Sequence, residues 1–140
     1  MDSAMASSRR KARIAAMKVL YELDSSDHEL TATLQRALDE SALNDDAKAL
    51  AQSLVEGVWR EKEALDRMIQ EHAPAWPVDQ LAAVDRNILR IAIFEILFNN
   101  KTPPKAAINE AVELSKIFGN ESLHRFVNGV LGSIMATANP

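Results

Sequence analysis

The sequence contains no cysteine, only four glycines and few aromatic residues, which make up 5% of its 140 residues. Without cysteine there is neither a disulfide framework nor a thiolate metal site. The glycines do not have the spacing of a P-loop or of a dinucleotide-binding fingerprint. No run of about 18 apolar residues is present, so the sequence predicts no membrane span. A soluble, cytoplasmic protein is the expectation.

Residues with catalytic or metal-binding chemistry are present but scattered. His28, His72 and His124 lie far apart and show no metal-ligand spacing. The acids are spread along predicted helical faces, and no carboxylate pair stands out as a catalytic acid and base. The sequence therefore predicts no enzyme, no metal and no cofactor.

The apolar residues recur at helical spacing over most of the chain. They amount to 47% of the residues, which is enough for the core of one domain. We expect an all-α fold of about seven helices in two packed bundles, forming a single domain over residues 1–140. The segment APAWPVD, residues 73–79, contains two prolines and is the clearest connector. It divides an N-terminal half, about residues 7–73, from a C-terminal half, about residues 78–136.

Short polar side chains predict where the helices of the N-terminal half begin. Ser7 or Ser8 is expected to cap the first helix, because a hydroxyl can accept a hydrogen bond from a free amide. Asn44 or Asp45 is expected to cap a longer helix in the same way. Gly57 lies inside this longer segment and predicts a close contact, a kink or a break.

The C-terminal half is predicted to assemble around one helix, residues 79–98, which is apolar on almost every side. Gly129 and Gly132 interrupt the last predicted helix, and their missing side chains suggest close helix packing. Asn109 and Asn128 stand among core-type residues and are predicted to be buried amides that hydrogen-bond each other or helix ends.

The charge is unevenly distributed along the chain. The net charge is −4, but residues 1–24 carry +2 and the remainder carries −6. Residues 7–21 hold five cations and no acid: Arg9, Arg10, Lys11, Arg13 and Lys18. If the helix begins at Ser7 or Ser8, these cations start at its positive end, where each costs about 0.3–1 kcal/mol. A bound phosphate would reverse that penalty.

The arginines of this segment have the spacing of an anion site. Arg9, Arg10 and Arg13 fall at i, i+1 and i+4, and a guanidinium group matches the geometry of a phosphate. A frayed, solvated N-terminus is the alternative interpretation. Tyr21 follows on the apolar stripe of the same helix, where it could belong to the core or offer its ring face to a base.

Four segments, in this order, resemble the NusB family of bacterial transcription antitermination factors: SSRRKARIAAMKVLYELD, VDRNILRIAIFEILF, PPKAAINEAVELSKIFG and SLHRFVNGVL. The resemblance extends from about Arg9 to Ile134. It implies an all-helical fold of two bundles without catalytic activity. It also implies binding of boxA-type single-stranded RNA from ribosomal RNA transcripts, together with the small-subunit ribosomal protein NusE, in the antitermination complex on bacterial RNA polymerase.

The resemblance further implies roles for individual residues. The residues implied to bind RNA are Arg9, Arg10, Lys11, Arg13, Ser122, Arg125 and Phe126. Those implied to bind the partner protein are Tyr21, Asp79 and Asp85. Two alternatives stay open, namely a helical protein–protein interaction module without RNA binding and a detached front domain of a ribosomal RNA methyltransferase. The choice between monomer and homodimer also stays open.

Overall fold

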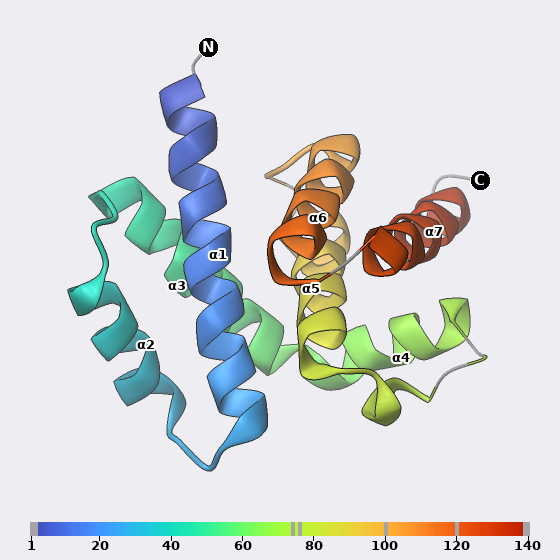
Figure 1. Cartoon of the computed structure of the whole chain (residues 1–140), viewed down its shortest axis with the longest axis horizontal. Helices are drawn as coiled ribbons and strands as arrows, with labels where there is room; N and C mark the ends of the chain where they lie inside the picture. The colour runs from blue at the N-terminus through green and yellow to red at the C-terminus, as the bar shows by residue number, and fades with distance from the viewer. Residues whose placement is uncertain (1–2, 74, 76, 100, 120, 139–140) are drawn as a thin grey trace. The chain divides into compact units, whose positions relative to one another are not determined.

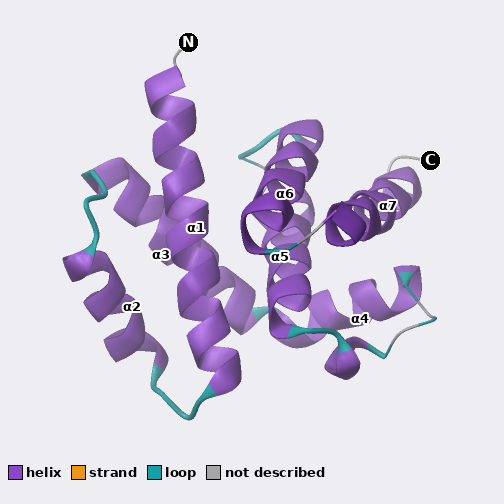
Figure 2. Cartoon of the chain, viewed as in Figure 1, coloured by secondary structure: helices purple, strands orange, loops and turns teal. Residues whose placement is uncertain are grey.

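Helices account for all the regular structure that the described residues form (Figures 1 and 2). A computed structural model describes residues 3–73, 75, 77–99, 101–119 and 121–138. Within these ranges there is no strand, and the predicted all-α fold with about seven helices is confirmed. The elements are α1 (Ser3–Ser25), α2 (Leu30–Glu40), α3 (Asp45–Arg60), α4 (Lys62–His72), the 3-10 turn η1 (Val78–Gln80), α5 (Ala83–Ile93), the π-helical segment η2 (Phe94–Asn99), α6 (Pro104–Phe118) and α7 (Glu121–Ala138).

The chain divides into two compact units, Met1–Trp59 and Arg60–Pro140. The first unit contains α1, α2 and nearly all of α3, and the second contains α4 to α7. The division falls earlier than the proline-containing connector at residues 73–79, where the sequence suggested a boundary. The reason is that α4 packs against α5 and α7, so it belongs to the second unit although it precedes the connector.

In the first unit, α1 packs against α2 and buries one face along its length. The buried apolar residues of α1 recur at helical spacing and are Ala12, Ala16, Met17, Val19, Leu20 and Leu23. Helix α2 begins where the carboxylate of Glu29 accepts hydrogen bonds from the N–H groups of Thr31 (2.9 Å) and Ala32 (3.0 Å). These two hydrogen bonds, that from Thr31 foremost, lower the pKa of the Glu29 carboxyl. Through them the Glu29 carboxylate caps the helix.

The start of α1 differs from the prediction. The helix begins at Ser3, so Ser7 and Ser8 lie inside it and do not cap it. The Ser8 hydroxyl instead accepts a hydrogen bond from the Asn44 side-chain amide (3.1 Å). The Asn44 carbonyl oxygen accepts from the N–H of Ala47 (2.8 Å), which confirms Asn44 as a cap of α3. One asparagine thus both begins α3 and ties it to α1.

Gly57 does not break its helix, because α3 continues through it to Arg60 and Gly57 is buried. The break comes at Glu61, and α4 begins at Lys62. Of the three outcomes that the sequence allowed, the break is therefore wrong, and the buried position of Gly57 fits a close contact.

In the second unit, α5 is the central helix, as the sequence predicted. It packs against α4, α6 and α7, and every residue from Asn87 to Ile96 is buried. The helix begins at Ala83 and not at Asp79, because η1 and Leu81 precede it. Beyond Ile93 the α-helical pattern widens into η2, where the N–H of Phe94 is shared between the carbonyls of Arg90 and Ile91.

Two predictions for the second unit are wrong. Gly129 and Gly132 lie on an exposed face of α7, and a Cβ atom built at either would meet nothing within 4 Å. Asn109 and Asn128 are exposed and not buried. Gly119 is the glycine that packing requires, because a Cβ atom there would overlap Leu123 at the start of α7.

Candidate nucleic-acid interface

The cations of α1 differ sharply in exposure. Arg9 and Lys11 are exposed, Arg10 is half-buried, and Arg13 is buried with 4% of its surface accessible. Arg10 and Arg13 already make polar interactions in the folded chain. The predicted cluster is therefore split, and the cations that face solvent are Arg9 and Lys11.

The helix dipole does not explain these cations. Because α1 begins at Ser3, Arg9 is the seventh residue of the helix and lies beyond its first turn. The dipole acts on charges within about one turn of the helix end. The expected penalty, and its relief by a phosphate, are thus a wrong explanation for this segment. What distinguishes the segment is exposed positive charge in a stretch of sequence, residues 7–21, that contains no acid.

Lys18 extends the exposed charge and was not assigned to the site from the sequence. It is exposed, and it lies seven residues after Lys11, so the two project from one face of α1 about 10 Å apart along the axis. No hydrogen bond or ion pair joins Lys18 to another residue that the structure describes. The seven-residue spacing is the sequence signal that could have identified it.

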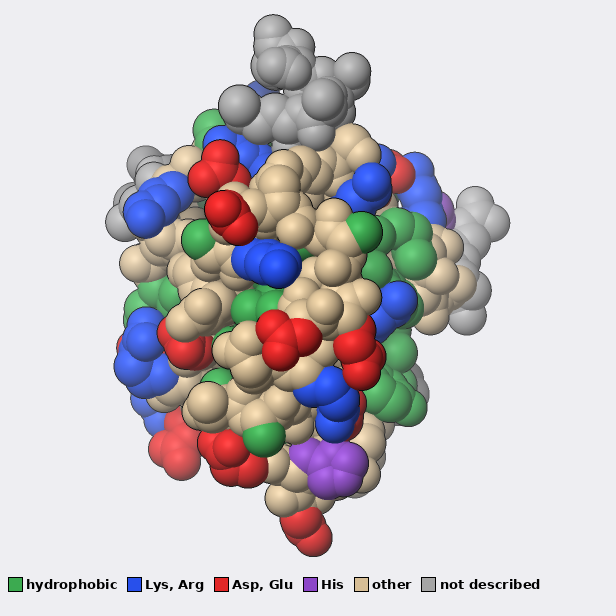
Figure 3. Space-filling view, turned by 90° about the vertical axis from the view of Figure 1, so that its left-hand side faces the viewer, with side chains coloured by type: hydrophobic (Ala, Val, Ile, Leu, Met, Phe, Trp, Pro, Cys, Tyr) green, Lys and Arg blue, Asp and Glu red, His purple; other side chains and the backbone are tan. Residues whose placement is uncertain are grey.

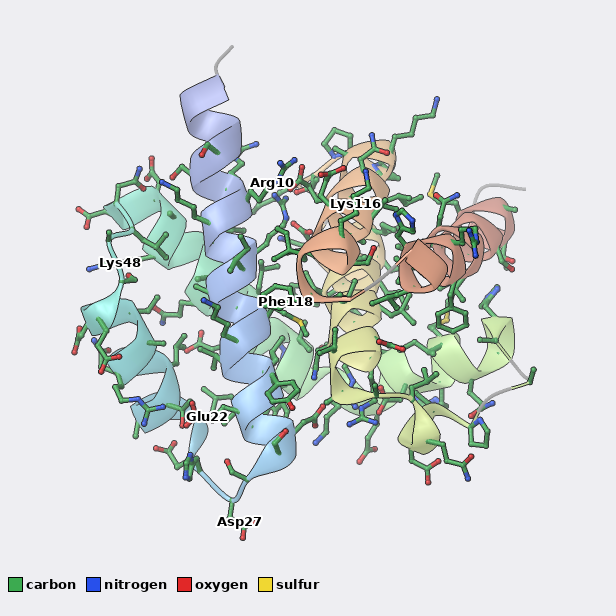
Figure 4. All side chains as sticks on the ribbon, in the orientation of Figure 1. Arg10, Glu22, Asp27, Lys48, Lys116 and Phe118 are labelled. Atoms are coloured by element: carbon green, nitrogen blue, oxygen red, sulfur yellow. The ribbon has the colours of Figure 1, made fainter. Side chains whose placement is uncertain are left out.

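The acid that could neutralise Lys18 is already engaged. Glu22 lies one turn further along α1, at i+4, but its carboxylate accepts from Arg36 Nη2 of α2 (2.7 and 2.6 Å) and from His28 Nδ1 (2.6 Å). Figure 4 places Glu22 near the end of α1. These hydrogen bonds, Arg36 foremost, lower the pKa of Glu22. The carboxylate that lies one turn from Lys18 is therefore already used in the contact between α1 and α2.

One face of the molecule shows a different pattern of charge. The face drawn in Figure 3 mixes Asp and Glu with Lys and Arg side chains, without a continuous field of one sign. Residues 7–21 of α1, in contrast, hold five cations and no acid.

The remaining RNA-binding candidates lie in the second unit at the start of α7. Arg125 is exposed and makes polar interactions, and Phe126 is half-buried. Ser122 lies in the first turn of α7, but its side chain is outside the part of the chain that the structure describes. The helix therefore presents one guanidinium and part of one aromatic ring.

The partner-binding candidates are also divided between the units. Tyr21 belongs to α1 and is 47% exposed, so it is a surface residue and not a core one. Asp79 is exposed on η1, and Asp85 is half-buried in the first turn of α5. Burial raises the pKa of Asp85, against the opposing effect of a hydrogen bond from its own backbone N–H.

Two side chains hold the segment that carries Asp79. Arg86 Nη1 donates to the backbone carbonyl oxygens of Leu81 (2.9 Å) and Val78 (3.3 Å), and the N–H of Val78 donates to the side-chain Oε1 of Gln70 on α4 (2.9 Å). Asp79 is therefore presented on a turn fixed to both α4 and α5. Such fixed geometry suits recognition of a partner protein, because little conformational freedom is lost on binding.

Within the described residues there is no group of three or more His, Cys, Asp or Glu side chains that could hold a metal ion. No helix in the same part of the chain is both long and apolar enough to cross a membrane. The groups that these surfaces present are exposed cations, a few exposed aromatic rings and acids held in fixed positions. The fold and these surfaces define a small all-helical protein whose exposed cations suit a polyanionic ligand.

Comparison with known proteins specifies this class further. Residues 10–136 match the NusB family, and the chain belongs to that family. It is 48% identical over 134 residues to the transcription antitermination protein NusB of Roseiflexus sp. (strain RS-1), covering 94% of each chain. It is 47% identical over 133 residues to that of Chloroflexus aggregans, covering 94% of this chain and 89% of the relative.

Solved structures agree with this assignment. A crystal structure of the antitermination factors NusB and NusE in complex with double-stranded RNA superposes with a TM-score of 0.85 at 31% identity, covering 93% of this chain and 97% of the other. NusB of T. maritima superposes with a TM-score of 0.83 at 35% identity, covering 90% and 89%.

Proposed function

We propose that this chain is a bacterial transcription antitermination factor that binds RNA together with the ribosomal protein NusE in the cytoplasm. The chain acts as a non-enzymatic adaptor: it holds the transcript and the protein partner and catalyses no reaction. The observation that carries the proposal is that a NusB-family chain exposes Arg9 and Lys11 on α1, in a stretch of sequence that contains no acid. The solved structure of a relative, NusB, in complex with NusE and double-stranded RNA supports a combination of RNA and NusE as ligands.

The RNA ligand is boxA-type single-stranded RNA of ribosomal RNA transcripts. The exposed groups of Arg9 and Lys11, with the half-buried Arg10, neutralise phosphates, and contacts of this kind fix the position of the strand. Arg13 supports these residues from within the fold, because its burial leaves little surface for RNA. At the start of α7, Ser122 and Arg125 supply further polar contacts and Phe126 a ring edge.

The protein ligand is NusE, and residues of each unit are assigned to its binding: Tyr21 in the first unit, and Asp79 and Asp85 in the second. The residues from 25 onward carry a net charge of −6, which complements a basic ribosomal protein and limits indiscriminate RNA binding. Exposed Tyr21 supplies the aromatic contact that protein interfaces favour.

A titration against RNA tests this assignment. The variant Arg9→Gln with Lys11→Gln should bind a boxA-type single strand about tenfold or more weakly, because charge-assisted contacts to phosphate are lost. The slope of log affinity against log salt should flatten by about 0.7 per lost contact. The matched control is Lys48→Gln with Arg67→Gln, which removes two cations elsewhere. Equal binding by both variants would disprove the role of α1.

The partner surface is tested with NusE itself. Asp79→Lys should weaken NusE binding, because the substitution turns an attraction into a repulsion. The affinity for NusE should also fall less steeply as the salt concentration rises. Glu71→Lys, which changes an exposed acid on α4, is the control for a general change in charge.

A duplex and a scrambled single strand complete the comparison of RNA ligands. Binding of NusE but of no RNA would support a protein-interaction module instead.

A further inference from the structure

Phe98 is an aromatic side chain that the fold holds at the surface. It is 43% exposed, although it directly follows the most buried stretch of the second unit. Its ring is stacked nearly parallel on that of Phe94, with centroids 6.1 Å apart and an angle of 10° between the ring planes. Phe94 is itself buried, so the exposed ring rests on a fixed support.

The backbone at this point is also unusual. Phe94 and Phe98 both lie in η2, the π-helical segment between α5 and α6. Such segments are rare and are frequently found at functional sites. Here the segment ends the central helix with an aromatic ring in solvent, where a polar residue would be the ordinary choice.

The sequence that surrounds Phe98 carries positive charge. The stretch from Ile96 to Asn109 contains two lysines, Lys101 and Lys105, and no acid, within a chain of net charge −4. Both lysines are exposed, and neither makes a hydrogen bond or ion pair with a residue that the structure describes.

The acids on either side of this stretch already make interactions in the folded chain. Glu95 is buried, and its carboxylate accepts a hydrogen bond from the Thr102 hydroxyl (3.2 Å). Glu110, which directly follows the stretch, also interacts with other groups, and Glu113 accepts from Lys116 Nζ (3.1 Å). Local acids therefore leave the charge of Lys101 and Lys105 uncompensated.

We propose that Phe98, Lys101 and Lys105 form a second RNA subsite, in which an unpaired base stacks on the Phe98 ring and the lysines neutralise adjacent phosphates. An aromatic platform beside exposed cations is the arrangement by which proteins bind single strands without reading the base sequence. A basic protein would be repelled by the same lysines, so charge favours nucleic acid as the occupant. The inference rests on the proposed RNA-binding function and adds a contact surface to it.

The first test separates stacking from packing. Phe98→Leu keeps an apolar side chain over Phe94 but removes the ring, and it should weaken binding of a boxA-type single strand about fivefold or more. Phe98→Trp keeps an aromatic face and should bind within about twofold of the unsubstituted protein. Ile117→Ala, which changes an exposed apolar residue of α6, is the control and should bind normally.

The second test addresses the lysines. Lys101→Gln with Lys105→Gln should flatten the salt dependence of single-strand binding by about 0.7 per phosphate contact, while Arg67→Gln should leave it unchanged. A duplex of the same sequence should be insensitive to Phe98→Leu, because its bases are already stacked on one another.

The outcomes distinguish this inference from the function on which it rests. If Arg9 and Lys11 variants lose RNA affinity but the Phe98 and lysine variants do not, the subsite is disproved and the function stands. If Phe98→Leu weakens only NusE binding, the surface belongs to the protein partner and the RNA assignment is overturned. If the unsubstituted protein binds no single strand, with or without NusE, both proposals fail together.

Discussion

Arg90 of α5 and Asp66 of α4 form a two-pronged ion pair in the second unit. Arg90 Nε donates to Asp66 Oδ1 (2.7 Å) and Nη2 donates to Oδ2 (2.8 Å), while Nη1 donates to the Asn87 carbonyl oxygen (3.1 Å). The Arg90 side chain is 4% exposed and that of Asp66 is 24% exposed. The guanidinium group is thus almost fully surrounded by protein, and the Asp66 carboxylate is a charged partner that it binds with two hydrogen bonds.

Loss of Asp66 should therefore destabilise the second unit. Asp66→Ala removes this carboxylate from the buried Arg90 guanidinium group, and we expect a loss of about 2–3 kcal/mol in the free energy of unfolding, measured in urea. The figure lies below the usual 3–5 kcal/mol for a buried pair because water reaches part of the carboxylate. Asp66→Leu combined with Arg90→Met should recover much of that loss. Equal destabilisation by the single and the double variant would contradict this account.

Arg9 and Arg13 should separate stability from RNA binding. Arg13→Ala removes a buried side chain with existing interactions and should lower the free energy of unfolding by about 1–3 kcal/mol. Arg9→Ala removes an exposed side chain and should change stability by less than about 0.5 kcal/mol, while lowering RNA affinity. Thermal unfolding and an RNA titration on the same samples measure both effects. The opposite pattern would show that Arg13 is the residue presented to RNA.

Glu22 should make the first unit more stable at neutral than at acidic pH. Its pKa is lowered from the ordinary 4.5, chiefly by the hydrogen bond from Arg36 and then by that from His28. A carboxyl with a lowered folded-state pKa contributes stability above its unfolded-state pKa, and that stability disappears as the pH falls through the folded-state value. Glu22→Gln should therefore lower the urea midpoint at pH 7 and have a shrinking effect below about pH 4.

The control for Glu22 is Glu56→Gln, which replaces an exposed acid of α3 that makes no ion pair with another described residue. It should change the midpoint little at either pH. A Glu22→Gln effect of equal size at both pH values would show that the charge of Glu22 is irrelevant to its role.

Two glycines of the second unit should respond to alanine in opposite directions. A Cβ atom at Gly119 would overlap the Leu123 side chain and lie 3.0 Å from the Ser115 carbonyl oxygen, so Gly119→Ala should destabilise by about 1–3 kcal/mol. Gly129 is exposed inside α7 with nothing near its Cβ position. Gly129→Ala should therefore stabilise by about 0.5–1 kcal/mol through helix propensity. Chemical denaturation of the two variants measures the contrast.

The helices and the central position of α5 could be predicted from the sequence, because apolar periodicity and a continuous apolar helix depend on local pattern alone. Asn44 could be predicted as a cap for the same reason. The start of α1 could not be predicted. Ser8 is of a residue type that often caps helices, but its hydroxyl accepts a hydrogen bond from the Asn44 side chain at the start of α3. A short polar side chain can serve either purpose, and tertiary contacts decide between them.

Exposure within the candidate site was equally hard to predict. Arg9 and Arg13 share a residue type and a helix, yet one is exposed and the other buried, because the covering of α1 depends on residues distant in sequence. Gly129 and Gly132 suggested close packing, but the face of α7 that carries them is simply uncovered. Residue type predicted which chemistry the site contains, and only the fold shows which groups reach solvent.

The pairing of Glu22 with Arg36 and His28 makes the cationic surface of α1 a product of folding. In an isolated peptide of this helix, Glu22 would be at liberty to attract Lys18 one turn away. When α2 packs against α1, Glu22 pairs with Arg36 and no longer neutralises the charge of Lys18. A synthetic α1 peptide should accordingly bind polyanions more weakly than α1 does in the folded unit, because the pairing of Glu22 with α2 is absent from the peptide.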